Sequence, residues 1–212
     1  MSQRGSPILF LDFDGTLFST GKFEIDVNQI ISSIDPDLAA QLTDGVSRYR
    51  NDPKHNYSAA DYPILETLMS NPVVFERVSG LDREQYIFDD VYDLIDRANR
   101  VQVPMMILTF GIEKFQNFKR RGTVIENLPM VAINYPNKTS WIIDNVIAPN
   151  GKYHHDGPII LVDDRAGAFA TVVDPDIFSG YRIKRPQNSQ RSLDAETPDN
   201  AIDITSLAEI KF

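Results

Sequence analysis

The sequence predicts an α/β protein with a doubly wound, Rossmann-like parallel sheet and a small α-helical cap. Segments with helical periodicity separate three apolar runs, each of which ends at a polar residue: 7–11 before Asp12, 103–108 before Thr109, and 158–162 before Asp163. Continuous apolar runs of this length are typical of strands that are buried on both faces of a parallel sheet. Strands and helices that alternate in this way predict right-handed crossovers and an α/β architecture.

The first run leads into an insertion that is too long for a simple crossover. Gly15 lets the chain turn after the first strand, and the next helix with a clear apolar face begins at Leu81. Helical spacing inside the insertion predicts three helices: 23–34, 36–49 and 62–69. We therefore expect two units, a helical cap and an α/β catalytic core: 21–80 for the cap, and 1–20 with 81–212 for the core.

The remaining chain alternates helices with the other two strands. Apolar residues at helical spacing predict a helix over 81–100, which leads directly into the second strand. A further helix is expected from Thr139 to Val146, after a turn-like segment. The segment 187–203 is rich in Ser, Asp, Asn and Pro, so we expect a loose surface segment there.

The composition excludes several classes of function. The 212 residues carry 21 Lys and Arg against 30 Asp and Glu, a net charge of −9, which disfavours non-specific nucleic-acid binding. The absence of cysteine excludes disulfides, iron–sulfur clusters, thiolate zinc sites and cysteine nucleophiles. The first apolar stretch is short and contains Asp12, which argues against a signal peptide or a membrane span. We therefore expect a cytoplasmic protein.

Asp12 and Asp14 form the most informative motif of the sequence, in the string Phe-Leu-Asp-Phe-Asp-Gly-Thr-Leu. The two carboxylates leave the end of a buried strand, and Gly15 allows both of them and a main-chain carbonyl to face one point. Converging oxygen ligands suit Mg²⁺. With a phosphate present, one carboxylate can attack phosphorus while the other holds a proton for the leaving group. A polar turn after a strand is the alternative reading of the motif.

Polar residues after the second and third strands complete the pattern. Because ligands of doubly wound sheets bind beyond the carboxyl ends of the strands, Asp12, Thr109 and Asp163 are expected in one crevice. Asp163 and Asp164 are adjacent carboxylates, which repel one another unless a cation neutralises them. Thr109 offers a hydroxyl, although it could equally be an ordinary β-branched strand residue.

These motifs resemble those of the haloacid dehalogenase-like superfamily, whose members are mostly phosphatases that act through an aspartyl-phosphate. The resemblance extends from Asp12 to Asp164, and the cap matches the family only by its place in the chain. It implies that Asp12 is the nucleophile, that Asp14 is the general acid and base, and that Thr109 belongs to the second motif. The amides of Phe110 and Gly111 are then expected to bind phosphate oxygens. Asp12, Asp14, Asp163 and Asp164 are the expected Mg²⁺ ligands.

The third motif of the family is a lysine that precedes the last strand. Lys138 is the preferred candidate because it begins the helix at Thr139, from which its ammonium can reach the nucleophile and the phosphate. Lys152, Lys114 and Lys119 remain alternatives. The basic clusters 119–121 and 182–185 are expected to be solvated faces or charges at helix ends.

Two further groups of residues have weaker functional readings. The neighbouring His154 and His155 lie in a loop flanked by Gly and Pro, so we interpret them as surface residues rather than as a metal site. Aromatic and basic residues of the insertion are candidates for a substrate pocket, although amphipathic helices need such residues for packing as well: Tyr49, Arg50, Tyr57 and Tyr62.

The sequence therefore predicts a Mg²⁺-dependent phosphatase that acts on a small phosphorylated metabolite through an aspartyl-phosphate. A phosphotransferase or phosphomutase would use the same intermediate with another acceptor. A carbon–halogen hydrolase is disfavoured because it would not need the acid that Asp14 supplies. A non-catalytic phosphate-binding module is the alternative from a different class.

Overall fold

The computed structural model describes residues 5–51, 63–188 and 193–212. Six parallel strands form one sheet in the order β3-β2-β1-β4-β5-β6. Their bounds are β1 Ile8–Leu11, β2 Met105–Phe110, β3 Met130–Ile133, β4 Ile159–Asp163, β5 Phe178–Ile183 and β6 Ala201–Ile204. This is the strand order of a doubly wound sheet, and the chain changes direction across the sheet between β1 and β4. The predicted fold class is confirmed.

The three predicted strands are β1, β2 and β4, which occupy the middle of the sheet. The prediction for 187–203 is wrong at its end, since Ala201–Ile204 forms β6 and pairs with β5. β6 is an edge strand in which Ile202 and Asp203 are exposed, so its sequence lacks the continuous apolar run of a central strand. β5 contains polar residues, and β3 is a short strand whose side chains are mostly half-buried, so only pairing with their neighbours identifies them.

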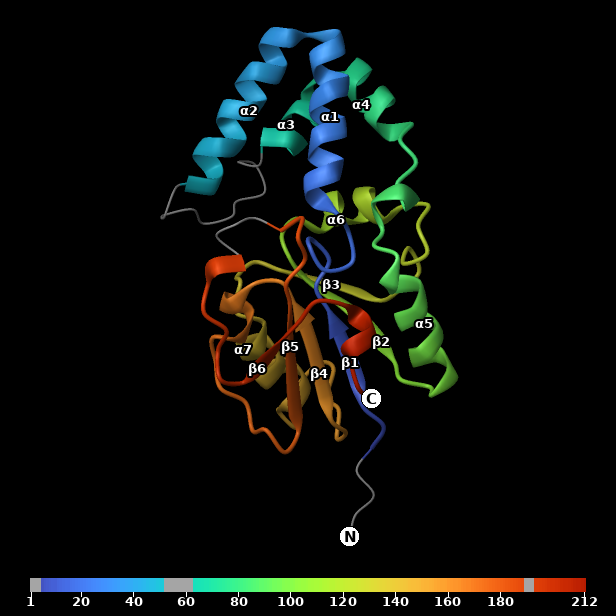
Figure 1. Cartoon of the computed structure of the whole chain (residues 1–212), viewed down its shortest axis with the longest axis vertical. Helices are drawn as coiled ribbons and strands as arrows, with labels where there is room; N and C mark the ends of the chain where they lie inside the picture. Colours follow the sequence, from blue (N-terminus) through green and yellow to red (C-terminus); the bar gives the residue numbers. More distant parts are fainter. Residues whose placement is uncertain (1–4, 52–62, 189–192) are drawn as a thin grey trace.

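In the described part of the segment predicted as a helical cap, four helices lie above the carboxyl ends of the strands (Figure 1). Their bounds are α1 Thr20–Ile34, α2 Pro36–Asn51, α3 Pro63–Ser70 and α4 Pro72–Ser79. Three of them match the predicted helices within a few residues. The sequence analysis missed α4, although Asn71 caps its first turn and Pro72 begins it, which is a recognisable start signal.

The segment predicted as one helix over 81–100 is divided in the structure. A 3₁₀ turn at Glu84–Tyr86 precedes helix α5 at Asp90–Arg100, with an extended link between them. In that link Ile87 pairs with Phe18, and the Ser19 amide donates to the Tyr86 carbonyl over 2.7 Å. The two segments that enter and leave the cap therefore run side by side. At Ile87 their pairing takes the place of the helical hydrogen bonds that the predicted helix would have formed.

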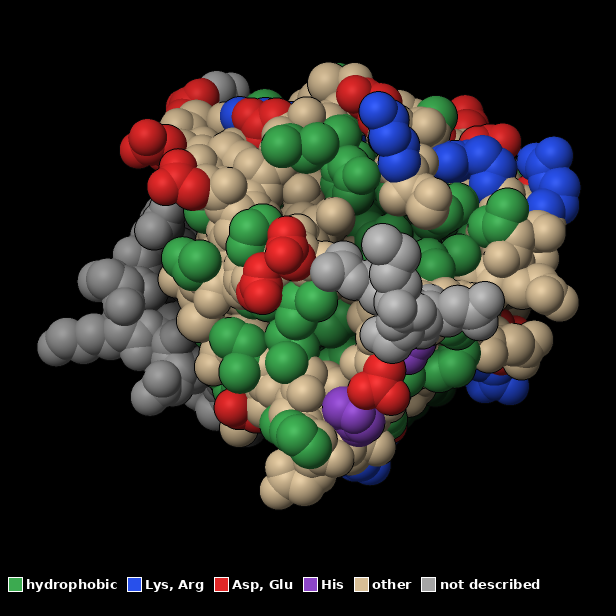
Figure 2. All heavy atoms as spheres, turned by 90° about the horizontal axis from the view of Figure 1, so that it is seen from below, with side chains coloured by type: hydrophobic (Ala, Val, Ile, Leu, Met, Phe, Trp, Pro, Cys, Tyr) green, Lys and Arg blue, Asp and Glu red, His purple; other side chains and the backbone are tan. Residues whose placement is uncertain are grey.

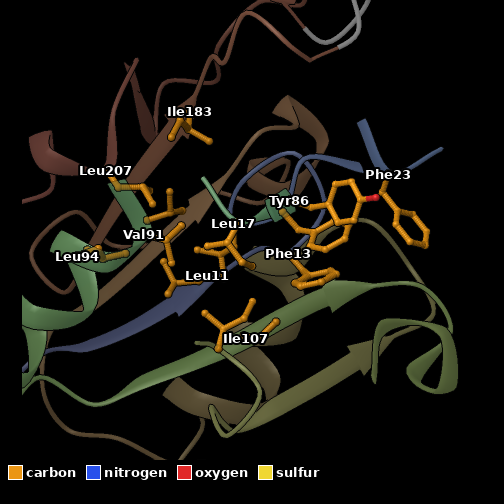
Figure 3. Close-up of a cluster of buried hydrophobic side chains, with 14 of the residues drawn as sticks. Leu11, Phe13, Leu17, Phe23, Tyr86, Val91, Leu94, Ile107, Ile183 and Leu207 are labelled. Atoms are coloured by element: carbon orange, nitrogen blue, oxygen red, sulfur yellow. The ribbon is translucent and has the colours of Figure 1, made fainter. Parts of the chain in front are cut away.

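Two hydrophobic clusters cover the two faces of the sheet. Because side chains alternate along a strand, Leu9 and Leu11 face one cluster and Phe10 faces the other. The first cluster continues from α5 and helix α6, at Glu113–Arg120, into the cap through Phe23 (Figure 3). The second contains Trp141 and other residues of helix α7, at Lys138–Ile142, and of the π-helical turn Ile143–Ile147. Core packing thus fixes the strand ends from both sides.

No helix among the described residues is both long enough and apolar enough to span a membrane.

Candidate active site

The candidate site lies at the carboxyl ends of the three central strands. Asp12 directly follows β1, Thr109 lies near the end of β2, and Asp163 is the last residue of β4. The Asp12 amide donates to the Val162 carbonyl over 2.8 Å, so the sheet pairing extends to the nucleophile candidate. The strand order places β1 between β2 and β4, so the three residues come from the ends of neighbouring strands. Asp12 and Asp163 line one small cavity there, whereas Thr109 is fully buried near the end of β2 and is not part of its lining.

Three carboxylates meet in this crevice. Oxygen atoms of Asp12, Asp163 and Asp164 all lie within 4.8 Å of one another, and the three residues are between 1% and 8% exposed. Like charges at this separation destabilise one another when they are buried. A buried cluster of three carboxylates therefore requires a cation, protonation, or both.

Lys138 supplies one cation to this cluster. Its ammonium donates to the carboxylates of Asp12 and Asp163, and its side chain is 2% exposed. The lysine begins α7, whose first turn is capped by the Asn137 side chain accepting from the Ser140 amide over 3.1 Å. This cap fixes the start of the helix, and hence the point from which Lys138 extends to the end of β1.

The raised pKa values of two carboxylates indicate that Lys138 alone does not neutralise the negative charge of the cluster. Burial and the charge of Asp163 raise the pKa of Asp12 to about 7, against the lowering effect of Lys138. Burial and the charges of Asp163 and Asp12 raise the pKa of Asp164 to about 8. Both directions show that a further positive charge would stabilise the ionised site.

Asp14 lies in a separate polar environment. Its carboxylate accepts hydrogen bonds from Thr20, from Gln116 over 2.8 Å, and from Lys119. Although burial alone would raise the pKa of Asp14, the charge of Lys119 and these three hydrogen bonds lower it. Lys119 therefore stabilises the ionised form of Asp14.

Thr109 and Gly111 differ in how far they match their expected roles. The Thr109 hydroxyl is fully buried and has no hydrogen-bond partner among the described residues. The Gly111 amide donates to the Ile133 carbonyl over 3.1 Å, so the prediction of a free phosphate-binding amide at Gly111 is wrong. β2 continues its pairing with β3 to this point, which sequence reasoning did not include. Phe110 lines the small cavity at the site together with Asp12 and Lys138.

Solved structures of similar fold cover nearly the whole chain. A putative haloacid dehalogenase-like hydrolase from Burkholderia xenovorans aligns with a TM-score of 0.68 at 12% identity, over 95% of this chain and 93% of that one. The putative HAD-hydrolase YfnB from Bacillus subtilis, bound to magnesium, aligns with a TM-score of 0.57 at 13% identity, over 98% and 97%. The chain has the haloacid dehalogenase-like fold. A putative beta-phosphoglucomutase from Thermotoga maritima shares it, with a TM-score of 0.57 at 13% identity, over 97% and 96%.

Neither a protein-family model nor a curated protein sequence matches this chain. Proteins described as dehalogenases also have the haloacid dehalogenase-like fold seen here. At 12–14% identity these similarities establish the fold, so the chemistry has to be argued from the residues of the site.

The other lysine candidates lie elsewhere on this fold. Lys114 is exposed on α6 and lines an apolar groove, and the ammonium of Lys152 lies 5.0 Å from the Tyr153 ring centroid. Lys119 is near the site but contacts Asp14 rather than Asp12. Among the described residues, Lys138 is thus the lysine that joins the nucleophile candidate Asp12 to Asp163 at the end of β4.

The basic clusters match their prediction in part, since Lys119 and Arg120 lie in the last turn of α6, as expected for charges at a helix end. Lys119, Arg182 and Arg185 are all buried. Arg182 donates to the Ala195 carbonyl over 2.6 Å, and Arg185 donates to the Thr16 carbonyl over 2.8 Å. Arg182 at the end of β5 and Arg185 just after it are indistinguishable from surface residues in the sequence, because their partners come from distant segments.

Residues that the sequence set aside remain outside the site. His155 donates to the Ser6 carbonyl over 2.8 Å, which places it at the end of the sheet opposite Asp12. Histidine side chains are visible on that face, away from the cap (Figure 2). Tyr57 and Tyr62 lie outside the described residues, as do the side chains of Tyr49 and Arg50.

Proposed function

We propose that this protein is a Mg²⁺-dependent phosphatase of the haloacid dehalogenase-like superfamily that hydrolyses a small phosphorylated metabolite through an aspartyl-phosphate. One observation carries the proposal: Lys138 joins Asp12 and Asp163 inside a buried cluster of carboxylates. On the neighbouring strand β2, the buried Thr109 hydroxyl has no hydrogen-bond partner among the described residues. Phosphoryl transfer needs this combination, because the enzyme must position a nucleophile and stabilise the charge on the phosphoryl oxygens.

The carboxylate cluster fits a divalent cation. Asp12, Asp163 and Asp164 carry up to three negative charges. The ammonium of Lys138 is buried with them, and the half-exposed guanidinium of Arg165 lies 4.0 Å from Asp164. We propose these three carboxylates as the ligands, with Asp14 contributing through its main chain since its carboxylate is bound to Lys119. Mg²⁺ prefers such oxygen ligands, and when bound it neutralises charge on both the nucleophile and the phosphate.

The residues of the chain divide the reaction between them. A carboxylate oxygen of Asp12 attacks phosphorus, and the bond from phosphorus to the leaving oxygen breaks while that oxygen receives a proton from Asp14. Water then attacks the aspartyl-phosphate, gives a proton to Asp14, and releases phosphate. Lys138 and the Thr109 hydroxyl bind the oxygens of the transferred group in both steps.

The size of the site supports a small transferred group. The cavity beside Asp12, Lys138 and Asp163 has a volume of about 30 Å³, which accommodates about two water-sized groups. Arg165 also lines this cavity, with a half-exposed side chain. We propose that the cap contacts the rest of the substrate, and that the net charge of −9 excludes extended nucleic acids as substrates.

Phosphate release from sugar phosphates, nucleotides and small phosphorylated acids tests this function. We expect release in the presence of Mg²⁺ and its loss on addition of a chelator. Activity that survives the chelator would rule out the metal assignment. Phosphorylated alcohols or sugars without free phosphate would identify a phosphotransferase, and halide release from a 2-haloacid would identify a dehalogenase.

Asp12→Asn tests the nucleophile directly. We expect phosphate release to fall by at least about 10⁴-fold, because the carboxamide cannot form the aspartyl-phosphate. Circular dichroism should show that the variant stays folded. Asp156→Asn, an exposed carboxylate at the opposite end of the sheet, serves as the control. Full activity of Asp12→Asn would remove Asp12 from the mechanism.

A further inference from the structure

Two side chains of helix α6 hold the carboxylate of Asp14. The Gln116 amide donates from Nε2 to Oδ2 over 2.8 Å, and the Lys119 ammonium donates to Oδ1. Gln116 and Lys119 are three residues apart, so they project from the same face of the helix. The two oxygens of the carboxylate are therefore held separately, which fixes its rotation as well as its position.

The bond to Asp14 leaves the rest of the Gln116 amide unsatisfied. An ionised carboxylate only accepts hydrogen bonds, so Nε2 must face Asp14 and Oε1 must face away. Gln116 is 4% exposed, and its Oε1 atom has no hydrogen-bond partner among the described residues. A buried, unpaired amide oxygen lowers stability, and a leucine at this position would avoid that loss.

Lys119 is an equally unfavourable residue for stability alone. Its side chain is 2% exposed, and its ammonium lies 4.9 Å from the Phe13 ring centroid and 5.0 Å from that of Phe115. Buried ion pairs are often no more stable than apolar side chains of similar volume. Neither polar side chain is explained by packing, and both contact the same carboxylate.

Gly111 provides the space that this arrangement needs. A Cβ atom at Gly111 would lie 3.0 Å from Nε2 of Gln116, and the residue has a φ of +149°. A side chain here would strain the backbone and crowd the Gln116 amide. The end of β2 thus leaves room for Gln116 beside Asp14.

We infer that Gln116 and Lys119 are positioning residues, which hold the Asp14 carboxylate in the orientation needed for proton transfer to the leaving oxygen. This inference rests on the proposed function, in which Asp14 supplies that proton. General acid catalysis depends on geometry within a fraction of an ångström, so a carboxylate that rotates freely transfers its proton less efficiently.

The leaving group of the substrate provides the kinetic test. The alkoxide of glycerol phosphate needs a proton as it departs, whereas the phenolate of p-nitrophenyl phosphate does not. For Gln116→Leu we expect kcat/KM to fall about 30-fold or more with glycerol phosphate and less than about 3-fold with p-nitrophenyl phosphate. Equal losses with both substrates would overturn the inference, since a general distortion of the site affects both.

Matched controls come from the same helix. Asn117 binds Arg120 over 2.9 Å, and Lys114 is exposed, so Asn117→Leu and Lys114→Met should leave both values of kcat/KM unchanged. The Tm of Gln116→Leu should equal or exceed that of the unmodified protein, because the substitution removes the unpaired Oε1 atom. A purely structural Gln116 would instead lower the Tm when it is replaced.

A crystal structure of Gln116→Leu separates this inference from the proposed function. We expect the Asp14 carboxylate to rotate away from its original orientation once Nε2 is gone. An unchanged carboxylate would overturn the positioning role, whatever the activity of the protein. If neither phosphate ester is hydrolysed by the unmodified protein, the phosphatase proposal fails, while the orientation of Asp14 still decides this inference.

Discussion

The two threonines Thr109 and Thr139 show how much one hydroxyl can reveal about a site. Both are fully buried near the carboxyl ends of the strands. Thr139 donates to Asn137 over 2.9 Å and accepts from the Thr171 amide over 3.0 Å, so its hydroxyl has a structural role. Thr109 has no such partner among the described residues. A buried hydroxyl without a partner lowers stability, which is consistent with a role in binding substrate.

Valine substitutions at these threonines should therefore have opposite consequences. Thr109→Val should leave the free energy of unfolding unchanged or raise it by about 1 kcal/mol, while kcat/KM for phosphate release falls about 100-fold. Thr139→Val should lower the free energy of unfolding by about 1 kcal/mol, because it leaves the Thr171 amide without its partner, whereas Asn137 still accepts from the Ser140 amide. Urea unfolding and steady-state kinetics measure both effects. A strongly destabilised Thr109→Val would contradict the binding role.

At the scale of elements, α5 is joined to distant parts of the chain through its first residue. The Asp90 carboxylate accepts from Arg185 over 2.8 Å, from the Leu207 amide over 2.9 Å and from the Ser206 hydroxyl over 3.1 Å. Arg185 also donates to the Thr16 carbonyl, in the loop that carries Asp14. One ion pair thus connects α5, the end of β5, the C-terminal turn Leu207–Glu209 and the loop of the candidate site.

Asp90→Asn should reveal this connection as a pH-dependent loss of stability. Although burial alone would raise the pKa of Asp90, hydrogen bonds from Arg185 and Leu207 lower it. A lowered carboxyl pKa contributes stability above the ordinary Asp value of about 4, and this contribution disappears as the pH falls through the folded-state pKa.

We therefore expect Asp90→Asn to lower the free energy of unfolding by about 2 kcal/mol at pH 7, and by less near pH 3. Urea denaturation at the two pH values measures the difference. Asp93→Asn, which breaks an exposed pair with Arg97, should change the free energy of unfolding by at most about 0.5 kcal/mol. A loss for Asp90→Asn that is independent of pH would contradict the ion-pair explanation.

The helices show where sequence patterns are sufficient and where they are not. α1 was predictable because Phe23, Val27 and Ile31 recur at helical spacing on one buried face. In α6 the burial of Lys119 was not predictable from the local sequence, because its partner Asp14 comes from another element. Local periodicity reports which face of a helix is apolar, whereas a buried charge depends on the element that packs against it.

At the scale of the whole molecule, the carboxylate cluster should link stability to metal binding. Asp12 and Asp164 have raised pKa values because burial and neighbouring carboxylates disfavour their ionised forms. These residues come from the ends of β1 and β4, so their repulsion acts across the centre of the sheet. A ligand that binds the folded state alone stabilises it by mass action, by about 2.7 kcal/mol at one hundred times its Kd.

Mg²⁺ should therefore raise the Tm of the protein, and EDTA should reverse the increase. Asp164→Asn should have a Tm in EDTA at least equal to that of the unmodified protein, because it removes one of the repelling carboxylates. It should gain little from Mg²⁺, since it has lost a ligand. Differential scanning calorimetry with and without Mg²⁺ measures both effects. An Mg²⁺-induced increase that is unchanged in Asp164→Asn would exclude this residue as a ligand.

The sequence was sufficient to predict the three central strands, most of the cap helices, and the positions of Asp12, Asp14, Thr109, Lys138 and Asp163 relative to those strands. These features are local, because an apolar run and the polar residue that ends it identify a buried strand and its carboxyl end. The neighbours of each side chain became visible only in the tertiary structure. It paired Lys138 with Asp12, Lys119 with Asp14, and the Gly111 amide with Ile133. Such contacts join residues far apart in the chain, so burial and charge at the site follow from packing that no local pattern encodes.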